Sequence, residues 1–130
     1  MDSLKGRVAV VSGASSGMGA DLAKQLALKG LIIAGLDIRK ERVEQIAKEV
    51  GNMGKIHAIK CNVADVKQVS EAFEWIDKNL GAITVLINNA GLSRAVNFEG
   101  ETNLFYMRTY RFLRPDRLPI IISCHFSNRP

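Results

Sequence analysis

The sequence predicts an α/β fold in which helices flank both faces of a doubly wound parallel sheet of about four strands. Short runs rich in valine and isoleucine alternate with amphipathic stretches of helical length. A glycine-rich loop separates the first apolar run from the first helical stretch, as expected where a strand leads into a crossover helix. Apolar residues form 47% and charged residues 24% of the chain, which excludes a disordered or collagen-like protein.

The individual elements follow from local patterns. Short apolar runs predict strands at 7–12, 31–36, 55–61 and 83–88. Apolar residues spaced three or four apart predict helices at 20–29, 41–50 and 66–80. Because parallel strands joined by helices form right-handed crossovers, we expect the spatial strand order three, two, one, four.

The composition changes near residue 103, and we divide the chain there. Residues 104–130 carry five arginines, one acid, all three prolines and five of the eight aromatic residues, whereas all 11 glycines precede them. This segment is too short for a core of its own and too apolar for a flexible linker. Its pattern is compatible with one more helix at 103–114 and one more strand at 120–124, or with a foreign segment from an altered reading frame.

Several kinds of protein are disfavoured. No apolar run approaches the roughly 18–20 residues of a membrane span, and none near the N-terminus suits a secretory signal, so we expect no membrane partner and a cytoplasmic location. Cys61 and Cys124 are then expected to be free thiols. His57 and His125 have no metal-ligand spacing, and the arginines of the tail form no recognised nucleic-acid motif, so we expect neither a metal nor a nucleic acid.

The strongest motif is the loop GASSGMG at 13–19, between the first strand and the first helix. The unpaired N–H groups and the positive dipole end of a helix N-terminus attract an anion. Glycines there remove the Cβ atoms that would hold a pyrophosphate away from the backbone. In this context the spacing GxxxGxG predicts nucleotide binding, with a purely structural turn as the alternative.

Asp37 ends the second strand, 18 residues after Gly19. A carboxylate in that place accepts hydrogen bonds from both hydroxyls of an adenosine ribose and repels a 2′-phosphate. Arg39 and Lys40 act in the opposite direction, unless they only begin a solvated helix, and Ser16 rather than a base precedes the second glycine. We therefore expect NAD as the cofactor and keep NADP as the alternative; a surface carboxylate is the structural alternative for Asp37.

The loop SGASSGMG at 12–19, Asp37 and the run NNAG at 88–91 together resemble the short-chain dehydrogenases/reductases. The stretches RVAVVSGASSGMGADLAKQLALKG and ERVEQIAKEV are most similar to the insect farnesol and alcohol dehydrogenase-like branch. The resemblance covers about residues 4–101. It implies a dinucleotide-binding Rossmann half-domain at 1–103, a divergent arginine- and aromatic-rich tail at 104–130, and hydride transfer between a nicotinamide and an alcohol or carbonyl carbon.

The resemblance also implies a set of cofactor-binding residues. Along the chain they belong to the pyrophosphate loop, the adenosine ribose site, the adenine site and the nicotinamide ribose site. They are Gly13, Ser15, Ser16, Gly17, Met18, Gly19, Asp37, Ile38, Arg39, Asn62, Val63, Asn89, Ala90 and Gly91.

This set departs from the family's pattern in three places. Asn62 replaces a usual aspartate, and Met18 replaces a usual isoleucine. Asp37, Ile38 and Arg39 stand where the insect branch has a small residue and two arginines suited to NADP, so the departure favours NAD.

The catalytic pair of the family, a tyrosine with a lysine four residues later, is absent from the sequence. Four residues after Tyr106 and Tyr110 lie Tyr110 and Arg114, and the last lysine is Lys78. Arginine is no substitute for that lysine because its charge is diffuse and it does not deprotonate in proteins. Ser123 follows an apolar run, as the family's catalytic serine does, but we assign it to the tail and assign no catalytic residue.

Three interpretations follow. The chain is an oxidoreductase by lineage, whose full-length form acts on an alcohol or carbonyl substrate; or a truncated, non-catalytic dinucleotide-binding module; or a non-functional product with a foreign tail. The substrate and the oligomeric state do not follow from these residues, because the family's substrate loops and pairing helices come after Gly91.

Overall fold

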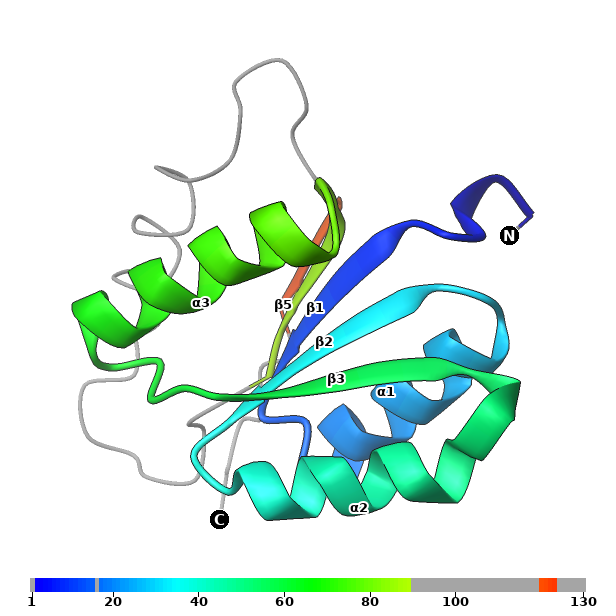
Figure 1. The fold of residues 1–130 in the computed structure, drawn as a ribbon, viewed down its shortest axis with the longest axis horizontal. Coiled ribbons are helices and arrows are strands. Elements are labelled where there is room, and N and C mark those ends of the chain that lie inside the picture. The colour runs from blue at the N-terminus through cyan, green and yellow to red at the C-terminus, as the bar shows by residue number, and fades with distance from the viewer. Residues whose placement is uncertain (1, 16, 90–119, 124–130) are drawn as a thin grey trace, which may run out of the picture.

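The computed structural model describes residues 2–15, 17–89 and 120–123, which form a parallel sheet with helices on both faces (Figure 1). The strands are β1 (Val8–Ser12), β2 (Ile32–Asp37), β3 (Lys55–Lys60), β4 (Ile83–Asn88) and β5 (Ile120–Ser123). The helices are α1 (Gly17–Leu28), α2 (Lys40–Val50) and α3 (Val66–Asn79), with short 3₁₀ turns at Asp2–Leu4 and Gly51–Met53.

The doubly wound α/β prediction is confirmed. The sheet order is β3-β2-β1-β4-β5, which contains the predicted order of the first four strands, and every strand pair is parallel. The predicted ends of the elements match the structure to within three residues, and those of β4 match at both ends. The largest difference is at α1, which begins at Gly17 rather than Ala20, because the last glycines of the loop already form the first helical turn.

The fifth strand comes from the segment that we assigned to a divergent tail. β5 pairs with β4 from Val85 opposite Ile120 to Asn88 opposite Ser123. This pairing covers the edge of β4, which the first four strands alone leave open. The helix expected at 103–114, and with it Tyr106 and Tyr110, lies outside the described residues, so the division of the chain at 103 stays a prediction.

Two apolar clusters hold the sheet between its helices. α3 covers one face, where Phe73 and Ile76 pack with Leu36 of β2 and Leu86 of β4. α1 and α2 cover the opposite face (Figure 1), where Val43 belongs to the second cluster. β1 lies between β2 and β4 and is buried at all five positions, which explains its continuous apolar sequence.

Cys61 follows β3 and belongs to the cluster beneath α3, with 1% of its surface exposed. Burial, assisted by the nearby Asp65 carboxylate, raises the pKa of the Cys61 thiol to about 11. The thiol is therefore protonated at neutral pH and shielded from reagents.

We expect Cys61 to react with a soluble disulfide reagent at pH 8 about 100-fold more slowly in the native chain than in urea, because the thiolate is the reacting form. The measurement uses Cys124→Ser so that one thiol is followed. Equal rates in the two conditions would show that the end of β3 opens to solvent.

Candidate functional site

The glycine loop turns over the carboxyl end of the sheet and is attached there to β2. Gly13 directly follows β1 with a φ of 68°, a conformation that favours glycine. Its N–H donates to the carbonyl of Leu36 at 2.8 Å, and the N–H of Ala14 donates to the same oxygen at 3.3 Å. The loop is thus bonded to the strand that carries Asp37.

The loop, the start of α1 and the end of β4 meet at Gly19. A Cβ on Gly19 would lie 2.1 Å from the Gly13 carbonyl oxygen and 2.5 Å from Nδ2 of Asn89. That same Nδ2 donates to the Gly13 oxygen at 3.4 Å. No other residue type fits at position 19 without displacing backbone. The first turn of α1 carries no acidic side chain, so no carboxylate of its own offsets the positive end of the helix dipole.

Asp37, Ser15 and Arg39 form one hydrogen-bonded network beside this loop. The carboxylate of Asp37, whose side chain is only 10% exposed, accepts from Ser15 N at 3.3 Å and from Arg39 N at 2.9 Å. Nε of Arg39 lies 3.6 Å from Oδ1 of Asp37, and Nη2 of Arg39 donates to Oγ of Ser15 at 2.9 Å. Asp37 and Arg39, whose charges favour different cofactors, therefore contact each other.

Ser12 joins β1 to β4 and was missing from the set of site residues expected from the sequence. Its buried hydroxyl accepts from Asn89 N at 2.9 Å and lies 3.2 Å from Oδ1 of Asn88, within donating distance. Asn88 is itself buried. The signal in the sequence is a serine that ends a buried valine run, but its partners lie more than 70 residues away.

Asn62 and Val63 follow β3, the neighbour of β2. Oδ1 of Asn62 accepts from Ala64 N at 3.0 Å, and Asn62 N donates to Oε1 of Gln68 at 2.8 Å. The side-chain oxygen of Asn62 is thus bonded within its own turn, while Val63 packs against the cluster beneath α3.

The other expected site residues take three kinds of position. Met18 in α1 and Ile38 after β2 are exposed apolar side chains at the carboxyl end of the sheet. Gly17 begins α1 with a φ of 60° and has open space where a Cβ would lie. Ser16, Ala90 and Gly91 lie outside the described residues.

Two further searches cover only residues 2–15, 17–89 and 120–123. No group of three or more histidine, cysteine or acidic side chains is placed to hold a metal ion there. Within the same ranges no helix has the length and apolar character that crossing a membrane requires.

Sequence comparison connects this geometry to a family. Residues 7–110 match the family model described as short chain dehydrogenase. The chain is 41% identical to farnesol dehydrogenase of Aedes aegypti over 105 residues, which cover 79% of this chain and 43% of that protein. It is 39% identical to D-threitol dehydrogenase of Mycolicibacterium smegmatis over 92 residues, 70% of this chain and 35% of that protein. The chain thus spans less than half the length of these relatives.

Solved structures agree with this result. A metagenomic short-chain oxidoreductase in complex with NADP superposes with a TM-score of 0.78 over 98% of this chain and 66% of that one, and its 22% identity shows the fold alone. A D-mannonate oxidoreductase from Haemophilus influenza, described as putative and with bound NAD, is 33% identical, with a TM-score of 0.66 over 71% of this chain and 33% of that one. From the family match, the identity to these relatives and the shared fold, the chain belongs to the short-chain dehydrogenase family of oxidoreductases.

Proposed function

We propose that this chain binds a nicotinamide dinucleotide across the carboxyl ends of β1, β2 and β4, and that it is the cofactor-binding part of an oxidoreductase for alcohols or carbonyl compounds. The observation that carries the proposal is the contact among Gly13, Gly19 and Asn89 at the start of α1. A single added Cβ fills this contact, and an unopposed helix N-terminus faces the same loop.

The described residues fit the two ends of such a cofactor's adenosine diphosphate. The backbone N–H groups of the loop from Gly13 through Gly19 suit a pyrophosphate, which is an anion. The Asp37 carboxylate, held by Ser15 N and Arg39 N, suits the ribose hydroxyls. When bound, the nicotinamide supplies or accepts the hydride. The part of the chain that the structure describes would bind this cofactor and orient it.

The same network favours NAD over NADP and gives Arg39 a role in that choice. A 2′-phosphate on the ribose would approach the Asp37 carboxylate, and like charges repel. The Arg39 guanidinium, with Nε 3.6 Å from that carboxylate, offsets part of the repulsion. We infer that NAD binds more tightly and that Arg39 keeps NADP from being rejected completely.

We expect Asp37→Asn to lower the ratio of the NADP to the NAD dissociation constant about fivefold for each ~1 kcal/mol of repulsion removed. Arg39→Ala is expected to raise that ratio, because the remaining carboxylate then faces the 2′-phosphate without a counter-charge. Titration calorimetry with both oxidised cofactors measures the ratios.

Glu74→Ala is the matched control, since it removes one negative charge from an exposed position on α3. That variant should leave the ratio unchanged. Tighter binding of NADP than of NAD by the unmodified chain would contradict the preference, and binding of neither cofactor would contradict the proposed function.

A second interpretation is supported by the sequence itself. In these 130 residues no tyrosine is followed by a lysine four positions later. We propose as the alternative that these 130 residues, taken by themselves, hold a dinucleotide without turning over a substrate.

A further inference from the structure

The outer edge of β3 is open in the part of the chain that the structure describes. β3 ends the sheet and pairs with β2 alone. It crosses the front of the molecule between α2 and α3 (Figure 1). An edge strand presents unpaired backbone N–H and C=O groups to any chain that lies beside it. The four central residues of β3 are half-buried, and only Lys55 and Lys60 at its ends are exposed.

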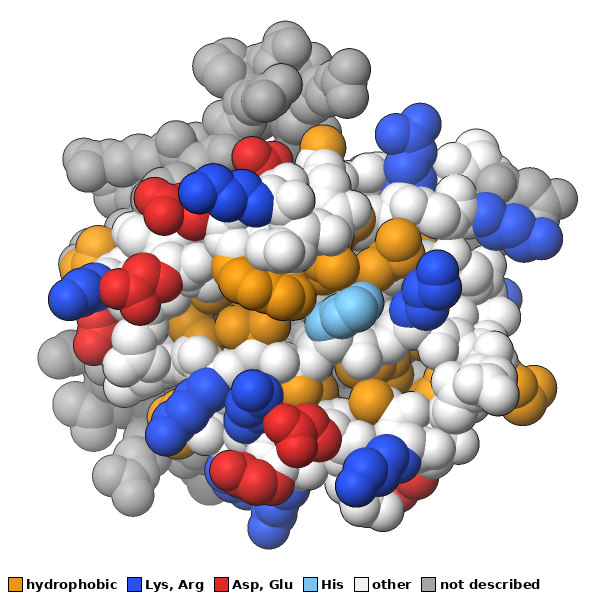
Figure 2. Space-filling model, viewed as in Figure 1, with side chains coloured by type: hydrophobic (Ala, Val, Ile, Leu, Met, Phe, Trp, Pro, Cys, Tyr) orange, Lys and Arg blue, Asp and Glu red, His pale blue; other side chains and the backbone are white. Residues whose placement is uncertain are grey.

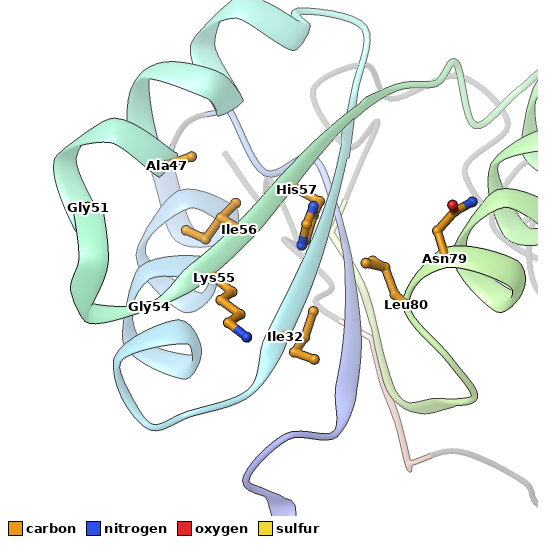
Figure 3. A pocket seen from close by; sticks show the side chains of 9 residues that line it. All are labelled: Ile32, Ala47, Gly51, Gly54, Lys55, Ile56, His57, Asn79 and Leu80. Carbon is orange, nitrogen blue, oxygen red and sulfur yellow. The ribbon is translucent and has the colours of Figure 1, made fainter.

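A pocket of about 560 Å³ straddles β3 near Lys55 (Figure 3). Ile32 and Leu80 line it and pack against the cluster beneath α3, whereas Ile56 lines it and packs against the cluster beneath α1 and α2. The pocket therefore opens to both faces of the sheet at once. Because successive side chains of a strand point to opposite faces, a strand added at this edge would place neighbouring side chains in both halves.

A second hollow of about 360 Å³ lies near the other end of β3, on the α3 side. It is lined by Ile59, Lys60, Ala72 and Trp75 together with polar Gln68 and Glu71. Trp75 is 42% exposed, and its ring centroid lies 6.3 Å from that of His57. Figure 2 shows that apolar side chains reach the surface of this face among basic and acidic ones. Apolar recesses thus accompany the strand along its length.

The charges at the ends of β3 select between possible occupants. Among the described residues, Lys55 and Lys60 form no ion pair, while the nearby Lys40 is paired with Glu44 at 3.8 Å. If a second copy paired antiparallel about a centre between residues 57 and 58, each lysine would face the other copy's opposite lysine, which is unfavourable. A segment with acidic residues at those two places would instead form two opposite-charge pairs. Glu71 is the one acid among the residues that line the adjoining hollow, and its charge opposes the segment's acid near Lys60.

We propose that Lys55–Lys60 is a docking edge for an extended segment of another protein, which adds to the sheet as a strand through backbone hydrogen bonds. The segment has apolar side chains in its centre and acidic residues five positions apart, matching the two lysines. This edge lies on β3 and not in the dinucleotide loop, but its Lys60 end is in register with Asp37 of the proposed ribose site on β2.

The test uses the full 130-residue chain without dinucleotide and a fluorescein-labelled probe peptide, Thr-Glu-Val-Ile-Thr-Val-Glu-Thr. The matched peptide has lysines in place of both glutamates, and a third has proline at the central isoleucine. By fluorescence anisotropy the acidic peptide should bind about fivefold more tightly than the basic one, the result of two cross-strand charge pairs. The proline peptide should bind more weakly than the acidic one, since it lacks a backbone donor. Hydrogen exchange of the Lys55–Lys60 amides should slow when the acidic peptide is added.

Two variants separate this docking from unspecific adhesion. Lys55→Glu combined with Lys60→Glu should reverse the order of affinity for the two charged peptides, and Trp75→Ala should lower the affinity for both. All three positions are exposed, and circular dichroism checks that the fold is kept. No binding of the acidic peptide at millimolar concentration, or equal binding of all three peptides, would overturn the proposal. Protection of the same amides without peptide that rises with protein concentration would assign the edge to a second copy and also overturn it.

Discussion

The 130-residue chain, incubated with NADH or NADPH and a panel of aldehydes, ketones and quinones, is expected to show no repeated turnover at the nicotinamide absorbance band. No tyrosine in it has a lysine four residues later to lower its pKa. General acid–base catalysis alone contributes about 10²–10⁴-fold to a rate. Without the tyrosine, the group that orients the substrate oxygen is lost as well, which removes a further and often larger contribution.

Gly13→Asp provides the background for this measurement, because a carboxylate in the loop would repel the pyrophosphate from the helix N-terminus. Turnover that persists after a second purification and disappears in Gly13→Asp would show that another group acts in place of the tyrosine. The same result would exclude the non-catalytic interpretation of the chain, but it would not contradict the proposed dinucleotide site.

Gly19→Ala is expected to have the largest effect among substitutions in the described site. Its Cβ would lie 2.1 Å from a backbone oxygen of Gly13, and a backbone atom cannot move aside as the end of a side chain can. Overpacking of this kind costs about 1–3 kcal/mol and sometimes more, and we expect the upper end of that range or above. Because the displaced atoms belong to the loop itself, dinucleotide binding should be lost together with stability.

Gly51→Ala is the matched control for this glycine. Gly51 has a φ of 60°, but nothing lies within 4 Å of the position of its Cβ, so the substitution adds backbone strain without a clash. Because its ψ of −136° puts this backbone near a region nearly confined to glycine, we expect Gly51→Ala to cost about 1–3 kcal/mol in urea unfolding and to leave cofactor affinity unchanged. An equal loss of cofactor affinity in the two variants would show that the affinity follows overall stability and not the contact at Gly19.

The elements of the fold could be predicted because their signals are local. α2 has apolar Val43, Ile46 and Val50 on one face, and these are its buried residues, so the helix and its inner face are readable from spacing alone. β1 is a continuous apolar run because it lies in the middle of the sheet. The start of α1 was harder to predict because glycine, a poor helix former, occupies its first turn.

The candidate site was predictable only in part, because only some of its features depend on local sequence. Gly13, Gly19 and Asp37 stand at strand ends and in a loop whose spacing is visible in the sequence. The charge around Asp37 could not be predicted in this way, because it depends on Arg39 turning back to contact both Asp37 and Ser15. No spacing rule distinguishes that arrangement from an arginine that extends into solvent.

The sequence alone determined the alternation of strands and helices, the glycine loop at a helix N-terminus and the acid at the end of the second strand. It also showed that these 130 residues contain no tyrosine followed by a lysine four positions later. Only the tertiary structure decided that Ile120–Ser123 pairs with β4, that the Ser12 hydroxyl joins β1 to Asn89, and that Gly19 leaves no room for a side chain. The first group arises from residues a few positions apart, whose backbone preferences and periodicity are local. The second joins segments far apart in the chain, such as Ser12 and Asn89 at a separation of 77 residues, and these meet only when the sheet brings the carboxyl ends of its strands together.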